Sequence, residues 1–192
     1  MKAFFSVLAL LLVTGCSSYD DNRASIASNN VNVLSQLESN SPGTVAKIND
    51  AYGFAIFTNS EVNLLVVHAG SGVGTVYNNQ TSEKIYMDIS SQGVGVGIGG
   101  SDIDAVFVFE DQQSMDKFTQ DGWTFSPSVE AKMIVNTDES LTIDGITVYK
   151  LTRNGTDLHA MLRGVSIERN DELNQTTLAE SLEIEEQTQM TE

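Results

Sequence analysis

The stretch GVGVGIGG, which runs from Gly93 to Gly100, decides how the central part of this chain folds. Glycine alternates with Val94, Val96 and Ile98, and a period of two is the period of a β-strand. A linker would not carry a β-branched residue at every other position. We therefore expect a strand with one apolar face and one bare face. The bare face either lets another group approach the backbone or serves only to curve the sheet.

The glycine stretches do not match a phosphate-binding loop. The earlier stretch GSGVGTVY, residues 70–77, has glycines at 70, 72 and 74 but lacks the last glycine of a GxGxxG pattern. Neither stretch contains the GK[ST] of a P-loop or opens a helix whose amides could hold a phosphate. A nucleotide-binding enzyme is therefore not indicated.

The N-terminus indicates export. Lys2 precedes a short apolar run, Ala3 to Val13, and the small residues after it lead to Cys16, the only cysteine among 192 residues. This arrangement resembles a bacterial lipoprotein signal, which implies cleavage of residues 1–15 and acylation of Cys16. The membrane is then a partner through the acylated Cys16. Ser17 resembles the sorting signal for a lipid-anchored position at the bacterial outer membrane, and we expect the domain to face the periplasm.

Composition argues against several classes of function. The chain carries 26 acidic and 10 basic residues and a formal net charge of −16, so we expect no nucleic-acid partner. His68 and His159 belong to no metal-binding motif, and acylation leaves no cysteine for a thiolate site. We expect no metal, no cofactor and no catalytic residue, although the many carboxylates leave a hydrolase open as a weaker hypothesis.

The pattern of apolar residues divides the chain into segments. Residues 16–40 combine the lipidated cysteine, a polar tether and a short helix on Val31, Leu34 and Leu37. Residues 41–167 form the domain, which opens with a helix that Ser41 caps and Pro42 begins. Residues 168–192 are acidic and poor in aromatics, which predicts a flexible tail.

Within the domain, the sequence predicts consecutive short strands and one amphipathic helix. The helix covers 111–121 and ends at Gly122, and a hairpin turn lies at Asp144-Gly145. The predicted strands cover 53–57, 62–68, 70–77, 83–89, the glycine stretch with a turn at 100–102, 105–110, 129–135, 141–143, 146–151 and 159–165. Long crossover helices are missing, so we expect an α+β fold with a curved, mainly antiparallel sheet or barrel-like core and a few short helices.

Several segments, taken in order, resemble the SYLF domain, also called the Ysc84-like domain. The resemblance covers residues 41–164 and lies in SPGTVAKINDAYGFAIF, HAGSGVGTVY, YMDISSQGVGVGIGGSDIDAVFVF, MDKFTQDGWTFSPSVEA and YKLTRNGTDLHAMLRGVSIE. It implies a compact β-rich domain that binds lipid or membranes. The family commonly carries lysines after its first strand, whereas this chain has no lysine or arginine between Lys47 and Lys84. We therefore expect apolar contact, rather than phosphate recognition, to dominate any lipid binding.

These observations predict a non-enzymatic, membrane-anchored envelope lipoprotein whose domain binds a phospholipid or another hydrophobic ligand. The alternative is a structural or protein-interaction module whose membrane contact comes only from the Cys16 anchor; the sequence identifies no protein partner. Trp123 is expected to pack in the core or at its rim, or to serve as a ligand platform. The candidate positions, either facing lipid or maintaining the fold, are Gly72, Gly74, Gly93, Gly95, Gly97, Trp123 and Gly164.

Overall fold

The computed structural model describes residues 17–136, 140–151, 162 and 164–175, and within strands and helices it describes no side chains for 17–22, 59–70, 92–103 and 150. Its helices are α1 (Ser17–Asn40), α2 (Thr44–Asp50), α3 (Gln112–Asp121) and α4 (Pro127–Glu130). Its strands are β1 (Gly53–Asn78), β2 (Lys84–Phe109), β3 (Trp123–Thr124), β4 (Ile134–Val135), β5 (Leu141–Ile143), β6 (Ile146–Leu151) and β7 (Val165–Arg169).

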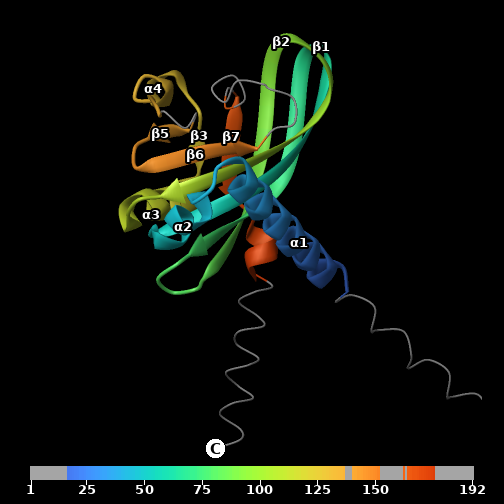
Figure 1. The fold of residues 1–192 in the computed structure, drawn as a ribbon. Helices are drawn as coiled ribbons and strands as arrows, with labels where there is room; N and C mark the ends of the chain where they lie inside the picture. Colours follow the sequence, from blue (N-terminus) through green and yellow to red (C-terminus); the bar gives the residue numbers. More distant parts are fainter. Residues whose placement is uncertain (1–16, 137–139, 152–161, 163, 176–192) are drawn as a thin grey trace, which may run out of the picture.

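One long hairpin forms the frame of the molecule (Figure 1). β1 and β2 each have 26 residues and pair antiparallel from Gly53 opposite Phe109 to Tyr77 opposite Lys84. The prediction of several short strands with a turn at 100–102 was therefore wrong. The glycines let the strands bend without reversing, and no proline interrupts the run because the chain has prolines only at 42 and 127.

The two ends of this hairpin belong to two different layers of a 7-stranded sheet among the described residues. Residues 104–109 of β2 pair with β6, which continues through β5 to β4, and with residues 53–58 of β1 on the other side. We call this the first layer. Residues 87–91 of β2 pair with β7, which continues to β3, while β1 lies on the other side. We call this the second layer.

The main core lies between these layers. It contains phenylalanines from the first layer and from α3, with Phe57 and Phe107 edge-to-face at 5.5 Å between ring centroids. Met115 and Phe118 enter it from α3, whose N-terminus is capped because the Asp111 side chain accepts the N–H of Ser114. Gly122 follows α3 with φ 74°, as the sequence predicts for a helix end.

The curl closes where the first and second halves of β1 meet. Gly74 is buried, and a Cβ placed there would overlap the Phe57 ring and lie 2.6 Å from the Ile56 carbonyl oxygen. A Cβ on Gly53 would lie 2.6 Å from the carbonyl oxygen of Tyr77. Residues about 20 positions apart on one strand are therefore in direct contact. This contact requires glycine at positions 53 and 74, because any side chain there would overlap the opposite half of the strand.

Two local predictions about helices and strands were wrong. Helix α2 begins at Thr44 after Gly43, whose φ is 87°, so Ser41 and Pro42 form the link from α1 and do not cap α2. The segment predicted as a strand over 129–135 begins with the last two residues of α4, for which Ser126 is the N-cap and Pro127 the first residue, and it ends in the two-residue strand β4. The predicted hairpin turn is confirmed, because Asp144 and Gly145 have φ values of 49° and 77°.

The segments at both ends of the domain are more ordered than the sequence suggests. Helix α1 begins at Ser17, so the residues expected to form a tether are helical. Residues 168–175 were assigned to the flexible tail, but β7 continues to Arg169 and residues 171–175 are helical. Asn174 is buried there, and its side-chain amide bonds both the N–H and the carbonyl of Tyr86, at 2.9 and 2.8 Å. It continues the hydrogen bonding of β2 where β7 ends. The fold class is nevertheless as predicted: α+β, with a curled antiparallel sheet and a few helices.

Replacing Gly74 with alanine tests the closure of the curl. Alanine normally stabilises a strand interior relative to glycine, so a loss of stability can be ascribed to contact with Phe57 and Ile56. We expect the free energy of unfolding, measured with urea, to fall by about 2 kcal/mol or more. Ser71→Ala, at an exposed position on the same strand, should change it by less than about 0.5 kcal/mol. A Gly74→Ala protein as stable as the parent would contradict the closure.

Candidate functional site

A second apolar cluster covers the outer face of the first layer. Its sheet residues, which we call the outer cluster, are Phe54, Ile56, Val106, Val108, Tyr149 and Leu151. All of them except Leu151 lie beside a residue of the main core along their strands, so these strands are apolar on both faces. This explains why GFAIF and AVFVF read as continuous apolar runs. The outer cluster is buried because α1 and α2 lie over it (Figure 1).

Helix α1 covers the outer cluster with few apolar side chains. Val33 and Leu37, four residues apart on one face, are its fully buried apolar residues among those described, and α2 adds Ile48. One turn before Val33, the amide of Asn30 is 5% exposed and donates to the Tyr77 hydroxyl at 2.9 Å. The half-buried Leu34 packs beside them, so the helix is held on this face by three aliphatic side chains and one buried amide.

The first half of α1 continues onto the second layer. The guanidinium of Arg23 donates to the carbonyl of Leu173 at 3.0 Å and lies 5.6 Å from the centre of the Tyr86 ring. The rings of Phe54 and Tyr77 stack at 4.8 Å where the two layers meet. Helix α1 therefore crosses the line along which the two halves of β1 come together.

A buried hydroxyl lies on the same outer face. Thr75 is 1% exposed, and its Oγ1 has no hydrogen-bond partner within the described part of the structure. It pairs with Tyr86 across the ladder and lies two residues before Tyr77, so all three share one face. Since α1 contacts both tyrosines, through Arg23 and Asn30, Thr75 lies beneath this helix.

A carboxylate fixes the corner between α1 and α2. Glu38, near the end of α1, accepts the N–H of Gly43 at 2.8 Å and that of Val45 at 3.0 Å. Both bonds lower the pKa of Glu38 below its ordinary value of 4.5, and the bond from Gly43 has the larger effect. With Asn79, whose amide donates to the carbonyls of Ile48 and Ala51 at 2.9 and 3.0 Å, this carboxylate positions α2 beside the outer cluster.

The middle of the β1–β2 hairpin contains the glycines proposed from the sequence as candidate site residues, and Figure 1 shows it extending beyond the rest of the sheet. Gly93 lies opposite His68 and Gly97 opposite Leu65. Between them the register shifts, so that two residues of β2, including Gly95, stand against one of β1, as in a β-bulge. Which face Val94, Val96 and Ile98 occupy lies outside the described residues, so the prediction of one bare glycine face stays a prediction.

The predicted site residues fall in separate places. Gly74 is buried at the closure of the curl, and Gly72, half-buried, lies two residues before it opposite Ile89. Trp123 is partly buried at the rim of the main core, with its ring centroid 5.4 Å from that of Phe107 and 6.0 Å from that of Phe125. Gly164 is exposed and has φ 76° just before β7, which is a reason for glycine there. Cys16 lies outside the described residues.

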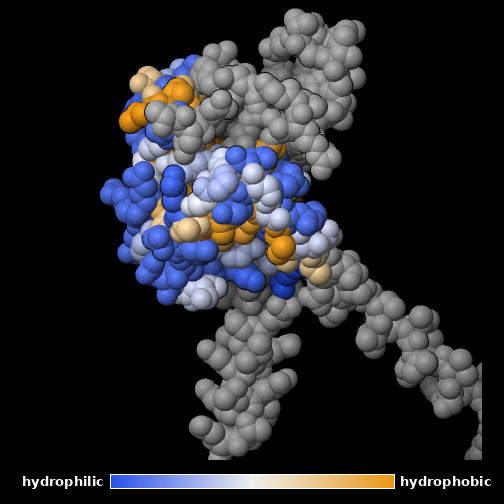
Figure 2. All heavy atoms as spheres, in the orientation of Figure 1, coloured by the Kyte–Doolittle hydropathy of each residue, from blue (hydrophilic) through white to orange (hydrophobic). Residues whose placement is uncertain are grey.

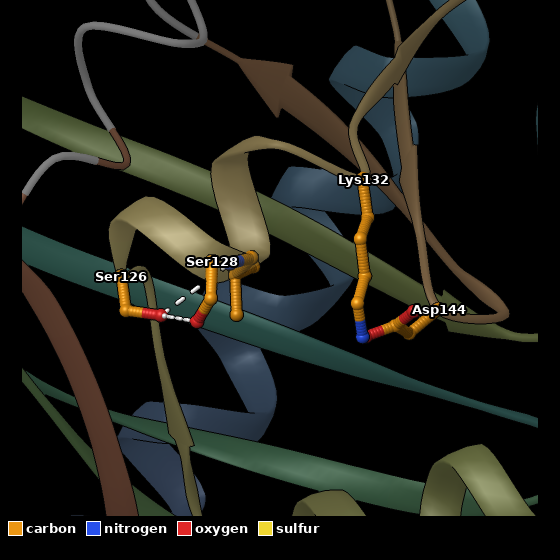
Figure 3. A network of polar contacts seen from close by, with 5 residues as sticks. Ser126, Ser128, Lys132 and Asp144 are labelled. Atoms are coloured by element: carbon orange, nitrogen blue, oxygen red, sulfur yellow. Dashed lines mark hydrogen bonds and ion pairs between the residues drawn. The ribbon is translucent and has the colours of Figure 1, made fainter.

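An apolar edge strand lies at the end of the first layer. Ile134 and Val135 of β4 are 61% and 67% exposed, and Figure 2 shows apolar atoms gathered at this end of the molecule. Figure 3 shows what holds the preceding segment: the Ser126 and Ser128 hydroxyls bond each other at 2.9 Å, and Lys132 pairs with Asp144 at 2.9 Å. Because this ion pair is exposed, it contributes little to stability.

The part of the chain that the structure describes contains neither a cluster of metal-binding side chains nor a helix that could span a membrane. No group of three or more histidine, cysteine, aspartate and glutamate side chains there is arranged to hold a metal ion. Among the described helices, none is both long and apolar enough to cross a membrane.

Comparison with known proteins places a distant relative beside this chain. The chain is 28% identical to Beta cell expansion factor A of Aeromonas veronii over an alignment of 149 residues, which covers 75% of this chain. The match spans 56% of the relative, so this chain corresponds to little more than half of that protein. No protein-family model matches the sequence.

Sequence reasoning missed the polar residues that attach α1 and the helical residues 171–175 to the sheet. Asn30 and Asn174 stand in segments that read as polar tether and acidic tail, and nothing in their immediate neighbours distinguishes them. A signal did exist for the outer cluster, because 54–57 and 105–109 are too uniformly apolar for strands that face water on one side.

The pH dependence of stability tests the role of Glu38. Folding lowers the pKa of Glu38, so the stability it contributes is present above its ordinary value of 4.5 and is lost as the pH falls through the lower folded value. Glu38→Gln should therefore lower the urea midpoint at pH 7 and converge with the parent protein at acid pH. The exposed Gln36→Ala serves as control. Parallel pH profiles for Glu38→Gln and the parent would contradict this role.

Proposed function

We propose that this protein is a non-enzymatic lipoprotein of the bacterial envelope whose domain binds an acyl chain of a phospholipid or of another hydrophobic ligand. The observation that carries the proposal is the outer cluster, an apolar surface on the outside of the sheet, separate from the main core. A domain of this size needs one core, so a second apolar layer under a helix with few buried apolar residues is available for another use.

The N-terminal sequence supports the anchoring part of the proposal. Cys16 ends the apolar run of the lipoprotein-like signal, and α1 begins at the next residue, Ser17. Acylation of Cys16 would tether the start of α1 to the membrane. Ser17 favours an outer-membrane location, with the domain facing the periplasm. The resemblance of residues 41–164 to the SYLF domain supports lipid binding by the domain itself.

Lipid binding is tested with a chain that has no anchor of its own. The mature protein, beginning at position 16 with Cys16→Ser, is incubated with phosphatidylethanolamine–phosphatidylglycerol vesicles and then separated from them by gel filtration. We expect phospholipid to leave with the protein peak and to be identified by mass spectrometry. Protein recovered free of lipid, with its circular dichroism spectrum unchanged, would contradict the proposal.

A protein-interaction module is the second candidate, and the exposed β4 edge favours it. An edge strand with two exposed aliphatic residues can accept a strand from another protein. If this edge is the functional surface, Ile134→Lys combined with Val135→Lys should abolish recovery of a specific envelope protein in a pull-down. The same double variant should leave lipid binding unchanged. A specific partner that both proteins recover equally would contradict use of this edge.

A further inference from the structure

We propose that the acyl chain binds between α1 and the outer cluster, and that α1 is a lid that moves aside to admit it. This inference rests on the proposed function and adds to it the location of the site. The occupant is an acyl chain of a free envelope phospholipid, lying in the place that Val33 and Leu37 fill in the closed form.

The surface under α1 has the chemistry that an acyl chain requires. All six residues of the outer cluster are aliphatic or aromatic, and Ile56 and Val106 at its centre are 0% exposed. The stacked ring of Tyr77 extends this surface toward the second layer. Apolar area removed from water would drive binding here, and no charged group is needed.

The lid is weakly attached for a helix of this length. Helix α1 has 24 residues, SSYDDNRASIASNNVNVLSQLESN, rich in serine, asparagine and aspartate, which favour helix ends over helix interiors. Such a helix depends on tertiary contacts, and its described residues supply two fully buried apolar side chains. The half-buried Leu34 adds a third apolar contact. An acyl chain of about a dozen methylenes offers at least as much apolar surface as these three side chains, so it can compete with α1.

Two polar features beneath the helix also fit a lid. Asn30 is a buried amide whose partner, the Tyr77 hydroxyl, would be satisfied by water once α1 lifts. Thr75 Oγ1 has no partner among the described residues in the closed form, although such buried hydroxyls are nearly always paired. A lipid ester carbonyl lying on this face could accept its hydrogen bond. Figure 2 shows apolar atoms between polar ones along the line of α1 and α2.

A photoreactive fatty acid locates the site directly. The mature chain with Cys16→Ser, which excludes the protein's own acyl anchor, is mixed with a diazirine-bearing palmitate, irradiated, digested and mapped by mass spectrometry. We expect adducts on residues 53–57, 104–109 and 146–151 and on the buried face of α1. Adducts confined to 59–70 and 92–103, or to β4, would overturn the location while leaving the proposed function intact. No adduct, with no phospholipid bound in the gel-filtration assay, would overturn both.

Two neighbouring asparagines provide a matched test of the lid. Asn30→Ala removes the hydrogen bond to Tyr77, whereas Asn29→Ala makes the same change at an exposed position. We expect Asn30→Ala to accelerate labelling about two- to tenfold, the factor that one hydrogen bond represents, and Asn29→Ala to label at the parent rate. Arg23→Ala, which frees the other end of α1, should also accelerate labelling and serves if Asn30→Ala does not fold. Unchanged or slower labelling in a folded variant would show that α1 is not a lid.

Discussion

The contact between the two halves of β1 is the constraint on which the rest of the structure depends. Gly74 lies against Phe57 and the Ile56 carbonyl of its own strand, so the 26-residue strand must curl through two layers. The curl places Phe57 and Phe107 in the main core. It also lets the two ends of β2 pair with different strands, residues 104–109 with β6 and residues 87–91 with β7. A side chain larger than hydrogen at position 74 would separate the layers.

The same curl creates the outer cluster. Because the first layer has a core on its inner face, the alternate residues of its strands point outward, and these are also apolar. Helix α1 covers them and crosses to Tyr86 on the second layer, so the segment next to Cys16 is also the cover of this surface. In our proposal, α1 therefore both follows the membrane anchor and covers the ligand site.

Much of the fold could be predicted from the sequence because its signals are local. The glycine alternation predicts strand, Asp144-Gly145 predicts a tight hairpin, and Asp111 to Gly122 reads as a capped helix. The length of β1 and β2 could not be predicted, since glycine marks a bend and a turn alike. The site was predicted at the glycines. The outer cluster instead depends on α1 and on contacts such as Asn30 to Tyr77, 47 residues apart, which no local pattern carries.

Nuclear magnetic resonance of the folded protein tests the closure most directly. If the halves of β1 meet as described, the Gly74 α-protons should show strong nuclear Overhauser effects to the ring protons of Phe57. Ring currents should also shift their resonances well away from values usual for a strand glycine. Both residues belong to one strand, 17 positions apart, so no extended β1 could produce this contact. Gly74 α-protons at ordinary shifts, with no cross-peak to Phe57, would contradict the account.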